Sequence, residues 1–323
     1  MNKIVLGTRG SDLALYQTRS VASELRAKGF DGEIEERIIQ TSGDRYKDLR
    51  LTDFSKGHRP IVEKGVFTKE LEDALLKGEI DAAVHSLKDL PSELDPCFQV
   101  ASVLRRAPIE DLLIFRGKAC LLEDLEENSC VATSSVRRAR TLRWMRPDVV
   151  ISEIRGNVST RLRKLIDGKA GHATILARAG VERLELYDSE TSQIIIENKV
   201  LECLPLSVSD FIPAAGQGAI AIETLADAPV VDSLKLINDV DTEDCVSVER
   251  EFLKLLGAGC DTPVGVSANL LSDNELKISA IVFDEEKLDS SPKTGTKTGK
   301  RNELNKIAFD LLKLMGIDAF KYE

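Results

Sequence analysis

The chain has 323 residues, with 44 Lys and Arg against 54 Asp and Glu, which gives a formal net charge of −10 at pH 7. A domain usually has about 100–200 residues, so this length predicts two or three domains. The hydrophobic content of 42% and the charged content of 30% are typical of globular proteins and exclude fibrous and disordered classes. The acidic total argues against non-specific attraction to nucleic acid or to anionic membranes.

The N-terminus and the cysteines predict a cytoplasmic protein with reduced thiols. Residues 1–7 lead directly into a strand-like segment instead of a signal peptide, and no apolar run is long enough to span a membrane. Six cysteines are too sparse for a disulfide scaffold and form no C-x-x-C pair. The three histidines are scattered, so no metal is expected.

The first two thirds of the chain alternate between strand-like and helix-like segments. Apolar runs typical of buried strands cover residues 4–6, 80–84, 130–133, 149–154 and 173–177. Apolar residues at helical spacing follow several of these runs, and Thr68 is a plausible N-cap for a helix that ends at Gly78. This alternation predicts an α/β fold with mostly parallel sheets and with ligands at the carboxyl ends of strands.

The pattern changes after about residue 225 and predicts a smaller α+β domain. A helix is expected from Asp244 to Leu256, followed by two alternating strands at 264–270 and 276–283. The polar stretch 284–301, rich in Lys, Ser, Thr and Gly, is expected to be an exposed loop before a last helix.

Residues 131–164 contradict the acidic total, because they contain nine Lys and Arg against two Asp and Glu. A solvated helix face is the structural alternative for several of these arginines. Other arginines stand where predicted strands pass into helices, and free backbone N–H groups favour an anion there: Arg9, Arg137, Arg138 and Arg155. Arginine forks bind carboxylates bidentately, so these turns would suit a ligand with several carboxylates.

Asp89 is a lone carboxylate just beyond the strand predicted at 80–84, with Lys88 beside it. An aspartate at this position can serve as a turn or cap residue. It can also hydrogen-bond the N–H groups of a ligand and stabilise a cationic intermediate. Spacing alone leaves both interpretations open.

Cys260 follows two glycines closely and precedes a proline, which predicts an exposed loop. Structural cysteines usually lie in apolar elements, so an accessible cysteine is a candidate nucleophile or attachment point. The glycine-containing segment 211–219 lacks the Gly-Lys-Ser/Thr ending of a phosphate-binding loop. We expect this segment to be a crossover or hinge between domains.

Eight segments, in this order, closely resemble the porphobilinogen deaminase family. They are GTRGS at 7–11, KGVFTKEL at 64–71, VHSLKDLP at 84–91, TSSVRR at 133–138, RGNVSTR at 155–161, LARAGVERL at 176–184, PAAGQG at 213–218 and GC at 259–260. The resemblance covers residues 7 to 265, which is most of the chain.

This resemblance implies two periplasmic-binding-protein-like (type II) α/β domains with an active-site cleft between them, and a smaller C-terminal α+β domain. The implied boundaries are 1–104 with 206–224 for the first domain, 105–205 for the second and 225–323 for the third. Enzymes of this family join four porphobilinogen molecules to a covalent dipyrromethane primer, with loss of ammonia, and release hydroxymethylbilane by hydrolysis. The resemblance also implies a monomer that passes its product to uroporphyrinogen-III synthase and has no nucleic-acid or membrane partner.

The resemblance assigns Asp89 as the catalytic carboxylate and Cys260 as the thioether anchor of the cofactor. The residues implied to bind the cofactor or the substrate carboxylates are Arg9, Ser11, Lys64, Lys88, Thr133, Ser134, Ser135, Arg137, Arg138, Arg155, Gly156, Asn157, Arg161, Arg183 and Gln217. One departure concerns the cofactor loop, which usually contains Glu-Gly-Gly-Cys and here contains Gly-Ala-Gly-Cys at 257–260.

Two other classes of protein would explain part of this sequence pattern. An anion-binding module without a reaction would explain the arginines but would leave Cys260 without a role. A nucleic-acid-binding protein is a poorer match, because the aromatic content is only 5% and no recognised motif is present.

Overall fold

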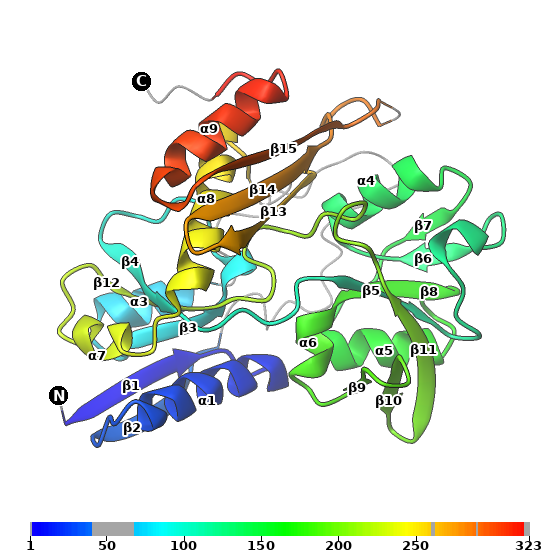
Figure 1. Cartoon of the computed structure of the whole chain (residues 1–323). Helices are drawn as coiled ribbons and strands as arrows, with labels where there is room; N and C mark the ends of the chain where they lie inside the picture. The colour runs from blue at the N-terminus through cyan, green and yellow to red at the C-terminus, as the bar shows by residue number, and fades with distance from the viewer. Residues whose placement is uncertain (1, 41–67, 260–261, 289, 320–323) are drawn as a thin grey trace. The chain divides into compact units, whose positions relative to one another are not determined.

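The computed structural model describes residues 2–40, 68–259, 262–288 and 290–319. These residues form two compact units (Figure 1). The first comprises Met1–Arg106 and Ala219–Asp244, and the second comprises Ala107–Gly218 and Cys245–Glu323.

The first unit contains a five-stranded mixed sheet with the strand order β2-β1-β3-β12-β4. Its strands are β1 (Lys3–Thr8), β2 (Glu33–Ile38), β3 (Ala82–Ser86), β4 (Phe98–Val103) and β12 (Ile220–Leu225). Strand β1 pairs in parallel with β2 and β3, whereas β12 is antiparallel to β3 and β4. The carboxyl ends of β1 and β3 therefore lie at the same edge of the sheet.

Helices cover both faces of this sheet. They are α1 (Asp12–Ala27), α3 (Lys69–Leu76) and α7 (Val231–Lys235). Val21 and Leu25 of α1 pack with α7 against one face, where Ile4 of β1 is buried. Leu71 of α3 packs against the other face beside Ala83. Burial of alternate strand residues on the two faces is what an α/β layer requires.

The second unit contains a seven-stranded mixed sheet with the order β7-β6-β8-β5-β11-β10-β9. Its strands are β5 (Asp111–Phe115), β6 (Cys130–Ala132), β7 (Val150–Ser152), β8 (Ala173–Ala177), β9 (Tyr187–Asp188), β10 (Gln193–Ile196) and β11 (Lys199–Pro205). Strand β6 pairs in parallel with β7 and β8, so the turns that follow these three strands share one edge.

Three helices pack on this sheet: α4 (Val136–Met145), α5 (Val158–Ile166) and α6 (Arg178–Glu182). Leu162 of α5 and Val181 of α6 bury one face. Leu142 of α4 packs against the other, together with Phe211. Short 3-10 turns occur at Leu87–Asp89 in the first unit and at Leu122–Asp124 in the second, and a third occurs at Arg301–Glu303.

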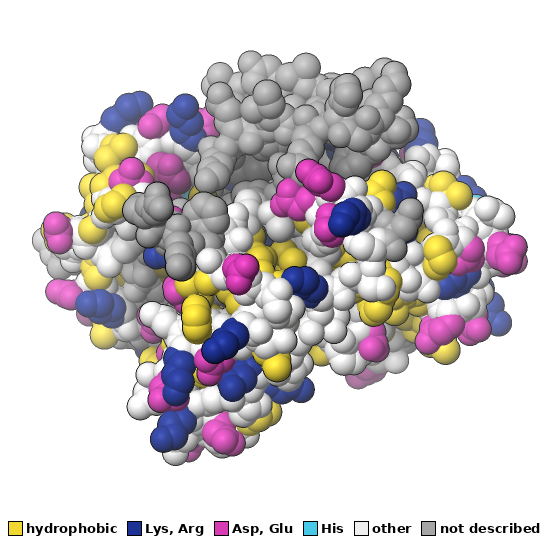
Figure 2. All heavy atoms as spheres, turned by 90° about the horizontal axis from the view of Figure 1, so that it is seen from above, with side chains coloured by type: hydrophobic (Ala, Val, Ile, Leu, Met, Phe, Trp, Pro, Cys, Tyr) yellow, Lys and Arg dark blue, Asp and Glu magenta, His cyan; other side chains and the backbone are white. Residues whose placement is uncertain are grey.

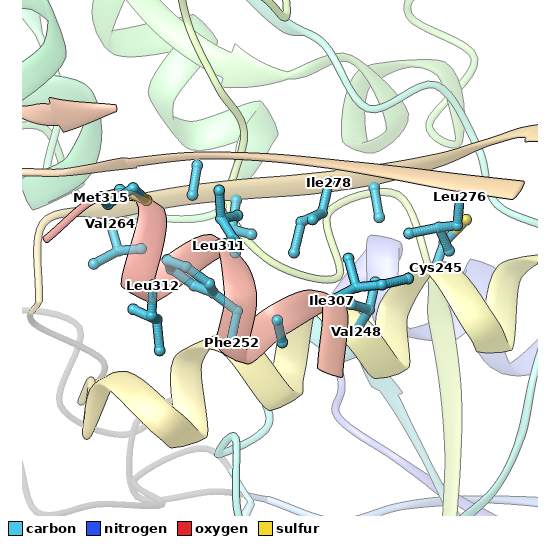
Figure 3. Packing of buried hydrophobic residues seen from close by; sticks show 14 residues of the cluster. Cys245, Val248, Phe252, Val264, Leu276, Ile278, Ile307, Leu311, Leu312 and Met315 are labelled. Carbon is cyan, nitrogen blue, oxygen red and sulfur yellow. The ribbon is translucent and has the colours of Figure 1, made fainter. Parts of the chain in front are cut away.

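A three-stranded antiparallel sheet forms the C-terminal part of the second unit. It consists of β13 (Val264–Ser272), β14 (Glu275–Val282) and β15 (Lys293–Lys300), in that order. Helices α8 (Val240–Leu256) and α9 (Leu304–Leu314) pack against it. Figure 3 shows Phe252 of α8 beside Leu311 and Leu312 of α9 under the strands.

Strand β15 corrects the expectation of an exposed loop over the polar stretch 284–301. Lys293–Lys300 pairs residue by residue with β14. A side chain at Gly295 or Gly299 would collide with α9, since an added Cβ would lie 2.6 Å from Met315 Cγ and 2.5 Å from Ile307 Cγ1 respectively. These glycines therefore let the helix approach the strand, while Lys293 and Lys300 at the two ends of this edge strand are exposed.

The observed layers confirm the predicted α/β class with a smaller α+β part. Two segments of the chain connect the two large sheets. One leads from β4 to β5, and the other leads back from β11 to β12. The three domain boundaries given above stay a prediction.

Candidate active site

In the first unit, predicted site residues follow the carboxyl ends of the adjacent parallel strands β1 and β3. Arg9 and Ser11 come directly after β1, and the Ser11 hydroxyl caps α1 by accepting a hydrogen bond from Ala14 N at 3.3 Å. The Gln17 amide of α1 donates to Ser86 Oγ at the end of β3, at 2.8 Å. This bond fixes the start of α1 beside the turn that carries Asp89.

Asp89 is exposed at the end of the 3-10 turn that follows β3, and Lys88 is exposed beside it. Leu87 anchors the turn in two ways. Its side chain is buried, at 2% exposed, and its backbone N–H donates to Ala219 O at 3.1 Å. Because Leu87 is buried and Asp89 is exposed, the turn leaves the Asp89 carboxylate accessible to a ligand.

In the second unit, two capped helices begin at the edge where β6 and β7 end. Ser135 Oγ accepts from Arg138 N at 3.4 Å, and Asn157 Oδ1 accepts from Thr160 N at 2.8 Å. The two turns are joined, because Thr133 N donates to Ser152 O at 2.8 Å and the Ser134 hydroxyl donates to Ile154 O. The N-termini of α4 and α5 thus lie at one edge of the sheet, where the positive ends of both helix dipoles favour an anion.

Arg155 and Arg161 are partly exposed beside the start of α5. Arg155 forms an ion pair with Glu153, and its side chain is 31% exposed. Arg161 Nε donates to Gly156 O at 2.8 Å. Gly156 has φ of +116°, a conformation that favours glycine, and an added Cβ would lie 2.6 Å from Thr160 Cγ2. The glycine therefore allows the turn to fold tightly between the two arginines.

Arg137 and Arg138 are buried, and both bind Asp111. Arg137 Nη2 lies 2.7 Å from Asp111 Oδ2, and Arg138 Nη2 lies 2.7 Å from Oδ1. Their Nη1 atoms donate to backbone oxygens, of Ile212 at 2.9 Å and of Ile175 at 3.0 Å. One Nη atom of each guanidinium thus binds a carboxylate of the chain, and the binding of ligand carboxylates by Arg137 and Arg138 stays a prediction.

The charge of this buried cluster remains positive. Burial by itself raises the pKa of Asp111, but the charges and hydrogen bonds of Arg138 and Arg137 outweigh burial and hold that pKa well below its usual range. Burial, opposed by Asp111, lowers the pKa of Arg137. The cluster contains one carboxylate, of Asp111, and two guanidinium groups, of Arg137 and Arg138. It therefore has a net positive charge at the first turn of α4.

Gln217 and Arg183 bind the chain segments that connect the two large sheets. The buried Gln217 amide donates to Ile109 O at 2.7 Å and to Asp111 Oδ1 at 3.0 Å. Arg183 Nη2 donates to Gly218 O at 2.6 Å, and Ala107 N donates to the same oxygen at 3.1 Å. In this structure both side chains hold the connecting segments together.

Two predicted site residues, Lys64 and Cys260, lie outside the described residues. On the N-terminal side of Cys260, the end of α8 is closed by Gly257 N, which donates to Lys254 O at 3.0 Å. On its C-terminal side, Thr262 leads into β13.

Sequence reasoning missed Asp111 and Glu249. Glu249 is fully buried in α8 and accepts from Gly216 N and Ala268 N, each at 2.7 Å. A signal for Asp111 was present, since a single acidic residue begins the apolar run Asp111–Phe115. A buried carboxylate requires a partner, and the basic stretch 131–164 supplies it.

Basic and acidic side chains are interspersed over the face shown in Figure 2. Within the described ranges, no cluster of His, Cys, Asp and Glu could hold a metal ion. None of the helices in the same ranges is both long and apolar enough to cross a bilayer.

The fold and these turns define an α/β protein with cationic side chains and helix N-termini at the carboxyl ends of its strands. Residues 4–233 match the family model described as "Porphobilinogen deaminase, dipyromethane cofactor binding domain". Residues 244–316 match "Porphobilinogen deaminase, C-terminal domain". The chain belongs to the porphobilinogen deaminase family.

Relatives named porphobilinogen deaminase match most of the chain. The protein from Sulfurimonas denitrificans is 37% identical over 300 residues, which cover 92% of this chain and 90% of the relative. The protein from Syntrophomonas wolfei subsp. wolfei is 42% identical over 277 residues, with 84% and 82% covered.

Solved structures of binding proteins show a weaker similarity. The probable amino-acid ABC transporter extracellular-binding protein ytmK from Bacillus subtilis has a TM-score of 0.38 at 12% identity, covering 72% of this chain and 88% of that chain. An ancestral cationic amino acid solute binding protein has a TM-score of 0.40 at 9% identity, with 73% and 88% covered. The family assignment rests on the sequence matches.

Membership in the family gives the activity. The chain is a transferase of tetrapyrrole biosynthesis that joins four porphobilinogen molecules head to tail, with loss of ammonia, and releases hydroxymethylbilane. Its cofactor is dipyrromethane, which this family binds covalently through a cysteine.

Proposed function

We propose that Asp89 is the catalytic carboxylate of this enzyme and that Cys260 attaches the cofactor. The observation that carries the first assignment is the exposed position of Asp89 at the carboxyl end of β3, next to the capped turn that follows β1. The second assignment rests on the Gly-Cys motif of the family and on the reactive character of a loop cysteine.

Asp89 acts by hydrogen bonding and by charge. A carboxylate accepts hydrogen bonds from pyrrole N–H groups and stabilises the positive charge that develops when ammonia leaves and when the new carbon–carbon bond forms. Lys88 beside it supplies a cation for a substrate carboxylate. Both residues belong to a turn whose backbone is held by the buried Leu87.

The described turns fit a cofactor that carries several carboxylates. Capped helix N-termini and partly exposed arginines are the donors that such groups need. The residues that would hold the cofactor or substrate carboxylates are Arg9, Ser11, Lys64, Lys88, Thr133, Ser134, Ser135, Arg155, Gly156, Asn157, Arg161 and Arg183. Arg137, Arg138 and Gln217 belong to the same proposed set, and their hydrogen bonds to Asp111 hold them in the interior. When bound, dipyrromethane supplies the nucleophilic pyrrole to which substrate units are added.

The remaining assignments follow from the family resemblance. The enzyme takes porphobilinogen as its substrate, works as a monomer in the cytoplasm and passes its product to uroporphyrinogen-III synthase. Its two α/β domains comprise 1–104 with 206–224, and 105–205, and the third domain, 225–323, carries the attachment cysteine.

Asp89→Asn tests the catalytic assignment. We expect turnover of porphobilinogen to fall by at least about a hundredfold, because charge stabilisation and proton transfer each contribute factors of this order. The fold should be retained, since Asp89 is exposed. Asp95→Asn is a matched control, because Asp95 is a nearby aspartate whose carboxylate accepts a hydrogen bond from Cys97 N within its own turn.

Turnover is measured as hydroxymethylbilane formed per enzyme, with circular dichroism as the check on folding. Near-normal turnover by folded Asp89→Asn would refute the assignment. An anion-binding module without a reaction would show no turnover in the unmodified protein.

A further inference from the structure

We infer that His85 and Glu223 are positioning residues for the turn that carries Asp89. The inference rests on the proposed catalytic role of Asp89 and adds a buried contact at the end of β3. His85 lies in β3, one residue before the strand ends, and Glu223 lies in β12. Both strands belong to the first unit.

The two side chains meet in the interior of the first unit. His85 Nε2 lies 3.1 Å from Glu223 Oε2, and the side chains are 4% and 0% exposed. The strand register explains the contact, because β12 is antiparallel to β3 and places Ala221 opposite His85 and Glu223 opposite Ala83. Residues two positions apart on a strand share a face, so His85 and Glu223 are diagonal neighbours on one face of the sheet.

The surroundings of this pair are largely apolar. Helix α3 packs against β3 and β12 on this face (Figure 1), where Leu71 lies with Ala83 and Phe98 in one buried cluster. A buried pair in such a place often gives no more stability than apolar residues of similar size. Apolar packing has no preferred direction, whereas a polar contact fixes which atoms meet. The pair therefore adds a directional link between β3 and β12.

A second carboxylate, Glu72 of α3, lies close to the pair. Burial is the largest cause that raises the pKa of Glu72, and the charge of Glu223 raises it further, against the opposing hydrogen bond with Thr68 and the influence of His85. A fully buried carboxylate such as that of Glu223 requires a polar partner. Within the described ranges, His85 supplies that contact.

The pair lies where β3 passes into the turn of Asp89. The next residue, Ser86, pairs with Ile220, and Leu87 N then donates to Ala219 O at 3.1 Å. The turn thus depends on how the end of β3 sits against β12, and the pair links these two strands one position earlier. A misplacement of about 1 Å can cost about a hundredfold in rate, so this link bears directly on Asp89.

Steady-state kinetics and amide exchange on the full-length enzyme test the inference. His85→Leu alone leaves a buried carboxylate without its partner and is expected to fold poorly. The double variant His85→Leu, Glu223→Leu removes both polar groups at similar volume, so the fold should be retained. Glu223→Gln keeps an acceptor for His85. Thr224→Val is the matched control, because Thr224 is fully buried beside Glu223 in β12 and its hydroxyl has no hydrogen-bond partner among the described residues.

We expect the turnover number of the double variant to fall by about three- to tenfold, the factor that loss of one polar contact gives, and to change more than KM. The Leu87 N–H should exchange faster by a similar factor. The Ile39 N–H, which donates to Thr8 O at 2.8 Å at the β1–β2 end of the same sheet, should keep its rate. Glu223→Gln and Thr224→Val should stay within about twofold of the unmodified enzyme in turnover.

Normal turnover and normal Leu87 exchange in the double variant would overturn the positioning role. Equal acceleration at Leu87 and Ile39 would also overturn it, since the whole sheet would then have lost stability. The same is true if Glu223→Gln loses as much turnover as the double variant, because the acceptor would then be irrelevant. Normal turnover by Asp89→Asn would instead overturn the catalytic role, and Leu87 exchange would still decide whether the pair holds the turn.

Discussion

Asp111→Asn should destabilise the second unit by an amount that the structure allows us to estimate. Asp111 Oδ2 binds Arg137, while Oδ1 binds Arg138 and Gln217. An asparagine offers one oxygen and one N–H₂ group, so whichever way it turns, a donor faces a buried donor. The change also leaves two buried guanidinium groups without a counter-charge.

Removal of one partner from a buried ion pair costs about 3–5 kcal/mol. We therefore expect the free energy of unfolding to fall by about this amount, measured from urea unfolding followed by circular dichroism. Asp167→Asn is the matched control, because the Asp167 side chain is 51% exposed and pairs only with Lys169 at the surface, where such a pair contributes about 1 kcal/mol or less. A loss below about 1 kcal/mol for Asp111→Asn would refute the role assigned to this cluster.

The same cluster predicts a pH dependence with a defined sign. The folded state holds the pKa of Asp111 well below the unfolded value of about 3.9. Its stabilisation is therefore complete above about pH 5 and is lost progressively as the pH falls below that value. The difference in stability between the unmodified protein and Asp111→Asn should shrink from pH 7 to pH 3, and an unchanged difference would contradict this explanation.

Three further predictions concern other parts of the second unit. Glu249→Gln should cost about 1–3 kcal/mol in urea unfolding, because an amide cannot accept from both backbone donors, and a loss below about 0.5 kcal/mol would count against it. Burial raises the pKa of Cys203 to about 12, so iodoacetamide at pH 8 should alkylate exposed Cys97 well before Cys203. Equal labelling of the two cysteines would contradict the burial of Cys203. Gly299→Val should lower the free energy of unfolding by about 1–3 kcal/mol in urea unfolding through collision with α9. Gly117→Ala, with open space around it, should be nearly neutral in the same measurement.

Local pattern was sufficient to predict the elements that present the site. The strand before Asp89 and the capped turns at Ser135 and Asn157 follow from apolar runs and from cap residues, which act over a few positions. The structure places these turns at shared edges of parallel pairs, as the alternation of strands and helices predicts.

Interactions between distant positions could not be read from local pattern. Asp111 and Arg137 are separated by 26 positions, so no spacing rule links the two residues. Strand β15 was missed because Lys, Thr and Gly predict a loop. It forms because β14 offers it an edge and its glycines accommodate α9.

Intact mass before and after exposure to porphobilinogen tests the central claim most directly. We predict that the purified protein carries a covalent adduct of two pyrrole units, and that further units add stepwise on exposure to substrate. Cys260→Ser should lack the adduct and form no product. An unmodified protein that makes hydroxymethylbilane, or an adduct that persists in Cys260→Ser, would contradict the account.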